Sequence, residues 1–123
     1  MASRVQLGQV VVERHGEVSV LRLLGEHDLS NVESVRRAIA TQIEADEGVV
    51  VSLVETQFLD ASIVTALFEG DEKLQPQSRR LVVHVATENV VRRVLEITGL
   101  NEALPTTGSL QDALAKASRG EGG

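Results

Sequence analysis

The carboxylate of Asp60 and the hydroxyl of Ser62 stand two residues apart, just before a segment whose apolar residues recur at helical spacing. A serine there is a candidate phosphoacceptor, because the first turn of a helix has unpaired N–H groups and a partial positive charge that hold an added anion. Both residues also have a structural use. Serine often caps a helix, which is worth about 1 kcal/mol, and aspartate orders turns by accepting backbone N–H bonds. From the residues alone, both interpretations stay open.

Other kinds of site find little support in the sequence. The chain has no cysteine, which excludes disulfides, zinc–thiolate sites and cysteine nucleophiles. Its three histidines show no metal-ligand spacing, so we expect no metal and no cofactor; they are His15, His27 and His84. The chain contains neither a nucleophile elbow nor a phosphate-binding P-loop, and we expect a protein that is not an enzyme.

Composition narrows the class of partner and the location. A net charge of −6 and an aromatic content of 2% disfavour nucleic acid, which needs cations for its phosphates and rings for its bases. No stretch approaches the roughly twenty apolar residues of a membrane span, and the N-terminus lacks the apolar core of a signal peptide. We therefore expect a soluble, cytoplasmic protein with no transmembrane segment. The length favours one domain, predicted over residues 5–117, with a polar, glycine-rich and disordered tail at 118–123.

Hydrophobic spacing predicts the elements that position Asp60 and Ser62. The apolar run from Val49 to Leu53 is typical of a strand buried on both faces of a parallel sheet. Gly25 is expected to end an earlier strand, and Ser30 with Glu33 has the spacing of a capping box at the start of the first helix. Strands are predicted at 10–12, 18–24, 49–53 and 81–86, with a short one before the last helix. Helices are predicted to begin near residues 30, 62, 90 and 109.

This order of elements predicts the fold class. Strands that alternate with helices indicate an α/β fold with a mostly parallel sheet flanked by helices, and the first two strands form an antiparallel hairpin around Gly16. On the helix after Ser62, polar residues recur at intervals of three and four opposite the apolar band. Thr65 and Glu69 belong to this polar stripe, which is predicted to face solvent.

Three short segments, in this order and spacing, resemble the STAS domain family of bacterial anti-sigma factor antagonists. Residues 25–29 (GEHDL) are similar to the G-E-L-D segment of that family, and residues 58–62 (FLDAS) to its F-[IL]-D-[SA]-S segment. Residues 91–100 (VRRVLEITGL) are similar to its V-x-R-x-L-x-x-[ST]-G-L segment. The resemblance covers almost the whole chain. It implies a STAS-like sheet of four to five strands packed against about four helices.

The resemblance also implies a function and a site. Members of the family bind an anti-sigma factor that is also a serine kinase, which frees the sigma factor for transcription; phosphorylation of the motif serine ends the binding. In this chain that serine is Ser62. The residues expected at the partner surface are Glu26, Asp28, Asp60, Ser62, Thr65 and Glu69.

Two positions depart from the family pattern and support an alternative. Ile63 stands where the family usually has glycine, and Ser52 where it commonly has aspartate. The alternative is a STAS adaptor that is not phosphorylated, in a stress-signalling assembly or in a lipid-transport ATPase complex. The sequence does not distinguish these partners, and it does not define the oligomeric state.

Overall fold

The structure is a computed structural model, and it describes residues 8–118. Within these residues the strands are β1 (Gln9–His15), β2 (Val18–His27), β3 (Gly48–Ser52), β4 (Thr56–Leu59), β5 (Val82–His84) and β6 (Thr106–Thr107). The α-helices are α1 (Val32–Glu44), α2 (Ala61–Leu74), α3 (Arg92–Thr98), α4 (Leu100–Ala103) and α5 (Leu110–Ala117). Two short 3₁₀ turns precede α1 and follow α2; they are η1 (Leu29–Asn31) and η2 (Gln75–Gln77).

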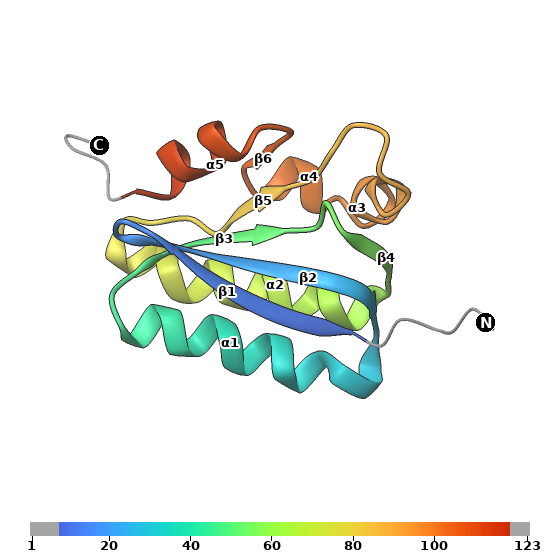
Figure 1. The fold of residues 1–123 in the computed structure, drawn as a ribbon, viewed down its shortest axis with the longest axis horizontal. Coiled ribbons are helices and arrows are strands. Elements are labelled where there is room, and N and C mark those ends of the chain that lie inside the picture. The colour runs from blue at the N-terminus through green and yellow to red at the C-terminus, as the bar shows by residue number, and fades with distance from the viewer. Residues whose placement is uncertain (1–7, 119–123) are drawn as a thin grey trace.

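One mixed sheet organises the molecule (Figure 1). The strands follow the order β1-β2-β3-β5-β6, and β4 pairs with β2 off this path. The β1–β2 hairpin is antiparallel and the other pairs are parallel. Helices α1 and α2 lie on one side of the sheet and α5 on the other. The predicted α/β class with an N-terminal hairpin is confirmed; the short elements β4 and α4 bring the described part to six strands and five helices.

The aliphatic core lies on both faces of the sheet. All five residues of β3 are buried, as the continuous apolar run predicted. Successive side chains of a strand point to opposite faces, so Val49 and Val51 join the cluster under α1 and α2. Val50 joins a smaller cluster beneath α5, which also contains Val18, Val20, Val82, Ala113 and Ala117.

Gly25 bends β2 and does not end it, which corrects the expectation from sequence. The strand continues to His27. Gly25 has a φ of 84°, a left-handed conformation that glycine adopts without steric cost, and the strand register shifts between Gly25 and Glu26. This bulge lets β2 pair with β3 over its first part and with β4 over its last. As a result, the chain beyond β2 lies beside the chain beyond β4.

Two predicted helix ends are confirmed, and one strand is shorter than predicted. Gly99 ends α3 with a φ of 79°, and Ser109 caps α5 by accepting the N–H of Asp112 at 3.2 Å. The strand predicted at 81–86 spans only Val82–His84, because its partner β3 ends opposite His84. Residues 5–7 of the predicted domain and 119–123 of the predicted tail lie outside the described residues.

Candidate functional site

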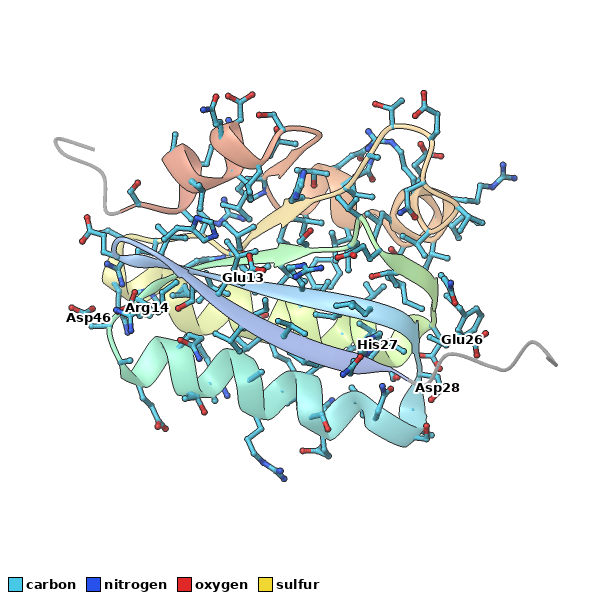
Figure 2. All side chains as sticks on the ribbon, viewed as in Figure 1. Glu13, Arg14, Glu26, His27, Asp28 and Asp46 are labelled. Atoms are coloured by element: carbon cyan, nitrogen blue, oxygen red, sulfur yellow. The ribbon has the colours of Figure 1, made fainter. Side chains whose placement is uncertain are left out.

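The site lies where two neighbouring parallel strands end at the same edge of the sheet. In the β2–β4 ladder, Glu26 is paired with Phe58 and His27 with Leu59. The next residues along the two chains are Asp28 and Asp60. Figure 2 labels Glu26, His27 and Asp28 at this end of the molecule.

Asp60, and not Ser62, caps helix α2, which corrects the structural interpretation of Ser62. The helix begins at Ala61, so Ser62 lies inside its first turn. One carboxylate oxygen of Asp60 accepts the backbone N–H of Ser62 at 2.9 Å and its hydroxyl at 2.6 Å. The hydroxyl of the half-buried Ser62 is therefore oriented by a carboxylate, in the arrangement of a serine next to a base.

Asp28 repeats this arrangement at the end of β2. Its Oδ1 accepts the backbone N–H of Ser30 at 2.9 Å and the Ser30 hydroxyl at 2.6 Å. These two hydrogen bonds hold the pKa of the Asp28 carboxyl below its ordinary value. Asn31 completes a capping box, because its Oδ1 accepts the N–H of Asp28 at 2.8 Å. The capping box predicted from Ser30 and Glu33 is thus wrong: the chain first forms the 3₁₀ turn η1, which moves the cap back to Asp28.

The buried His27 stabilises the Asp28 turn through its contact with Asn31. Its Nδ1 lies 3.1 Å from Nδ2 of Asn31, and its Nε2 lies 3.1 Å from the carbonyl oxygen of Leu24. An amide NH₂ only donates and a carbonyl only accepts, so this imidazole is neutral with its proton on Nε2. Burial lowers the pKa of His27 in agreement with the neutral form.

Sequence reasoning missed both His27 and Asn31 as parts of the site. The alternation of β2 contained a signal for His27. Leu21 and Leu23 face the core, and every second residue of a strand lies on the same face, so His27 is expected on the buried face too. Asn31 gave no such signal, because its role depends on the 3₁₀ turn.

The remaining predicted site residues are only partly brought together. Glu26 is exposed beside the Asp28 turn, and Thr65 is exposed one turn along α2 from Ser62. Glu69 lies a further turn away and forms an ion pair with Arg36 of α1, with Oε1 and Nε 2.9 Å apart. The structure therefore groups Glu26, Asp28, Asp60, Ser62 and Thr65 at one edge, and it ties Glu69 to the neighbouring helix.

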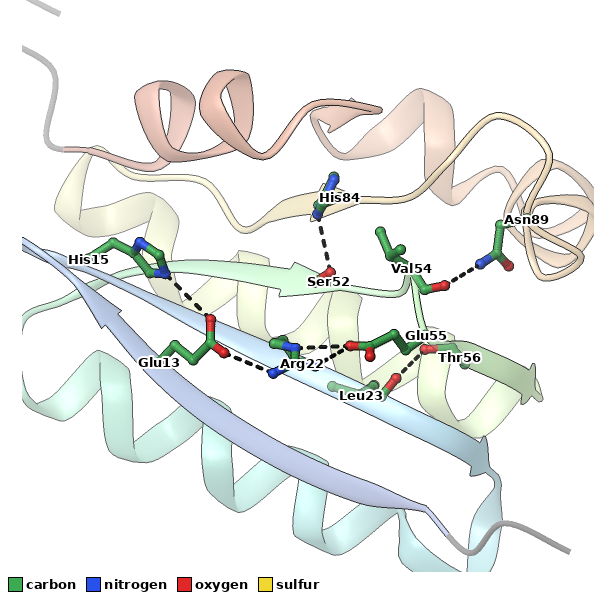
Figure 3. Close-up of polar contacts among 10 residues, drawn as sticks. All are labelled: Glu13, His15, Arg22, Leu23, Ser52, Val54, Glu55, Thr56, His84 and Asn89. Atoms are coloured by element: carbon green, nitrogen blue, oxygen red, sulfur yellow. Dashed lines mark hydrogen bonds and ion pairs between the residues drawn. The ribbon is translucent and has the colours of Figure 1, made fainter.

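The two departures from the family pattern have different surroundings. The side chain of Ile63 is fully buried in the core beneath the sheet, so it points away from the exposed edge and does not crowd the Ser62 hydroxyl. Ser52 lies on the sheet face that carries α5, where its hydroxyl is 3.1 Å from Nδ1 of His84 (Figure 3). Ser52 thus contributes nothing to the Asp60–Ser62 pair.

Within residues 8–118, no three histidine or acidic side chains come together as a set of metal ligands. None of the helices in this part of the chain has the length and apolar character that crossing a membrane requires.

Comparison with known proteins agrees with this geometry. The chain is similar to an anti-sigma factor antagonist from Mycobacterium paratuberculosis, with 27% sequence identity and a TM-score of 0.80 over 90% of this chain and 94% of that one. Its fold is also like that of SpoIIAA. The unphosphorylated form has 23% identity and a TM-score of 0.73, covering 86% of this chain and 93% of that one. The phosphorylated form, from Bacillus, has 22% identity and a TM-score of 0.65, covering 89% of this chain and 100% of that one.

No curated protein sequence matches the chain significantly. The model of the STAS domain matches residues 9–113, which include every strand and the start of α5. The chain therefore belongs to the STAS domain family.

Proposed function

We propose that this protein is an anti-sigma factor antagonist: it binds an anti-sigma factor that is also a serine kinase, and phosphorylation of Ser62 switches the binding off. The observation that carries the proposal is the hydroxyl of Ser62, held 2.6 Å from the Asp60 carboxylate at the start of α2. The likeness to the antagonist from Mycobacterium paratuberculosis supports the same role. In this role the protein acts in the cytoplasm and regulates sigma-factor-dependent transcription.

The charges around Ser62 explain how a phosphate acts as a switch. A phosphoserine carries about −1.5 to −2 charges at neutral pH. The dipole of α2 stabilises such an anion at its N-terminus, so the fold tolerates the modification. The same phosphate adds bulk and negative charge beside the carboxylate of Asp60, at the edge that also carries Asp28. A partner that fits the unmodified edge meets a steric clash with the phosphate, and the added charge changes the electrostatic match between the two surfaces.

The position of Ile63 supports phosphorylation over the adaptor alternative. A buried Ile63 leaves the approach to the Ser62 hydroxyl open. The alternative now depends on Ser52 alone, which takes the place of an aspartate and bonds to His84.

Affinity capture followed by phosphorylation with the purified partner tests the proposal. We expect capture of an anti-sigma factor with serine kinase activity, which transfers one phosphate from ATP to the wild type and none to Ser62→Ala. Ser30→Ala is the matched control, because Ser30 has the same hydrogen bonds to Asp28; it should be phosphorylated like the wild type. Equal phosphorylation of Ser62→Ala and wild type contradicts the switch. Capture of transporter subunits, with no phosphate on Ser62, favours the adaptor.

A further inference from the structure

Several segments at the edge of the sheet that carries Ser62 each expose an apolar side chain. Among residues 8–118, six large hydrophobic side chains are exposed. Four of them occur where strands end or in the short edge strand β4: Leu29 follows β2, Val54 follows β3, Phe58 lies in β4 and Val90 follows β5. We call these four residues the carboxyl-edge surface. Grouped apolar side chains that remain exposed typically mark an interaction site.

Hydrogen bonds hold the segments of this surface together. The side-chain amide of Asn89 donates to the carbonyl oxygen of Val54 at 3.1 Å (Figure 3). It also donates to the carbonyl oxygen of Leu53 at 3.0 Å, so that it ties the segment before Val90 to the end of β3. Phe58 is fixed by its ladder pairing with Glu26. Because the backbone of these segments is already ordered, binding of a partner here carries only a small entropic cost for ordering loops.

Within residues 8–118, the carboxylates beside this surface have no cationic partner. Glu26, Asp28 and Asp60 form no ion pair with a lysine or arginine of the described chain, whereas Glu47 pairs with Arg14 and Asp71 with Arg80. Unneutralised acid at the border of an apolar surface favours a partner that supplies the cations.

We propose that the carboxyl-edge surface is part of the docking site for the anti-sigma factor, which covers it with an apolar patch bordered by lysine or arginine. This inference rests on the proposed function and extends its contact area from the Ser62 turn to the ends of β3 and β5. A second copy of the chain fits less well. A two-fold contact places the same surface on both sides, and here it brings the acidic residues of both copies together.

Binding measurements with purified variants and the purified anti-sigma factor test the surface. Phe58→Ser and Val54→Ser remove apolar area without adding charge. Val12→Ser is the matched control, since Val12 on β1 is 45% exposed and Val54 is 41% exposed. We expect Phe58→Ser and Val54→Ser each to weaken binding by about fivefold or more, as residues that anchor interfaces do. Val12→Ser should bind within about twofold of the wild type, and all three variants should melt cooperatively.

The outcomes separate this inference from the proposed function. Weaker binding by Ser62→Glu with unchanged binding by Phe58→Ser and Val54→Ser overturns the surface and leaves the switch. Weaker binding by the two serine variants with unchanged binding by Ser62→Glu supports the surface and refutes the switch. A wild-type dimer in sedimentation that Val54→Ser converts to monomer identifies a second copy as the occupant and overturns the inference. If the wild type binds no anti-sigma factor, both proposals fail.

Discussion

Asp28 and Asp60 occupy equivalent positions at the ends of two paired parallel strands, and each carboxylate accepts the N–H and the hydroxyl of the serine two residues later. The two turns differ in their exposure and in the kind of helix that each begins. Ser30 is exposed and belongs to a 3₁₀ turn, whereas Ser62 is half-buried in the first turn of the fourteen-residue helix α2. This pair of turns allows each half of the site to serve as the control for the other.

Replacing Asp60 with alanine tests whether the carboxylate does more than cap a helix. Asp60→Ala and Asp28→Ala each remove a cap and should each lower the free energy of unfolding by about 1 kcal/mol. Only Asp60→Ala also frees the Ser62 hydroxyl, so at a saturating concentration of the partner kinase only this variant should slow phosphate transfer, by about tenfold or more. At lower kinase concentrations Asp28→Ala should also weaken binding, because Asp28 belongs to the proposed partner surface. Urea denaturation and phosphate incorporation measure the two effects. Equal rates for the two variants would reduce Asp60 to a structural role.

The parts of the site that could be predicted from sequence are those formed by neighbouring residues. Asp60 and Ser62 bond to each other across two positions, and the apolar spacing after them marks a helix. The continuous valines of β3 likewise predicted a strand buried on both faces, because burial at every position leaves no polar alternation.

The parts that could not be predicted depend on contacts between distant segments. Strand β4 has four residues and pairs only with the end of β2, beyond the bulge at Gly25; neither short segment shows this pairing by itself. Ile63 is different, because its place in the apolar band after Ser62 predicts that it is buried, and the structure confirms this. Asn31 matters only because the buried His27 lies beneath it.

A charge at position 50 tests the placement of β3 between two layers. Val50 is fully buried beneath α5, so Val50→Asp places an unpaired carboxylate in an apolar cluster, at a cost of several kcal/mol. We expect this variant to be unfolded or severely destabilised. Val12→Asp, at a half-exposed position of β1, should cost about 1 kcal/mol or less. Circular dichroism with thermal melting compares the two, and a stable, cooperative Val50→Asp protein would refute the position of β3.

Asp71 links the end of α2 to the start of β5, and its removal should be costly. Its carboxylate accepts hydrogen bonds from Arg80 at 2.9 Å and from the backbone N–H of Leu81 at 2.9 Å. Asp71→Ala leaves the buried N–H of Leu81 unpaired and removes the ion-pair partner of the more exposed Arg80, so we expect a loss of about 2 kcal/mol in the free energy of unfolding. Glu69→Ala breaks the more exposed ion pair with Arg36 and should cost less than about 1 kcal/mol. If urea denaturation shows equal losses of unfolding free energy for Asp71→Ala and Glu69→Ala, Asp71 does not have this linking role.

The same carboxyl predicts a loss of stability in acid. Burial alone would raise the pKa of Asp71, but the hydrogen bonds from Arg80, Leu81 and Gln75 outweigh burial and hold the pKa below its ordinary value of 3.8. A carboxyl with a lowered pKa stabilises the folded state above the unfolded pKa, and this contribution is lost as the pH falls below 3.8 toward the folded value. The wild type should therefore lose more stability than Asp71→Asn over this range. Parallel curves for the two proteins would exclude the contribution of Asp71.

His27 predicts a second pH dependence, nearer neutrality. Burial lowers the pKa of His27 below its ordinary value of 6.5, so the unfolded chain takes up a proton at a higher pH than the folded chain does. The stability from the neutral imidazole is complete above 6.5 and falls as the pH drops from 6.5 toward the lower folded pKa. His84 also has a pKa lowered by burial, so His27→Gln and His84→Gln should each reduce the slope of unfolding free energy against pH.

The effects of His27 and His84 can be distinguished, because protonation of each disturbs different hydrogen bonds. A proton on Nδ1 of His27 removes the acceptor of the Asn31 side chain, whose amide oxygen holds the N–H of Asp28. Nuclear magnetic resonance of the wild type between about pH 7.5 and 5 should therefore show the backbone signal of Asp28 shifting together with the His27 ring. In His84→Gln this coupled shift should persist, and in His27→Gln it should disappear. A shift of Asp28 that survives in His27→Gln would show that His27 does not support the Asp28 turn.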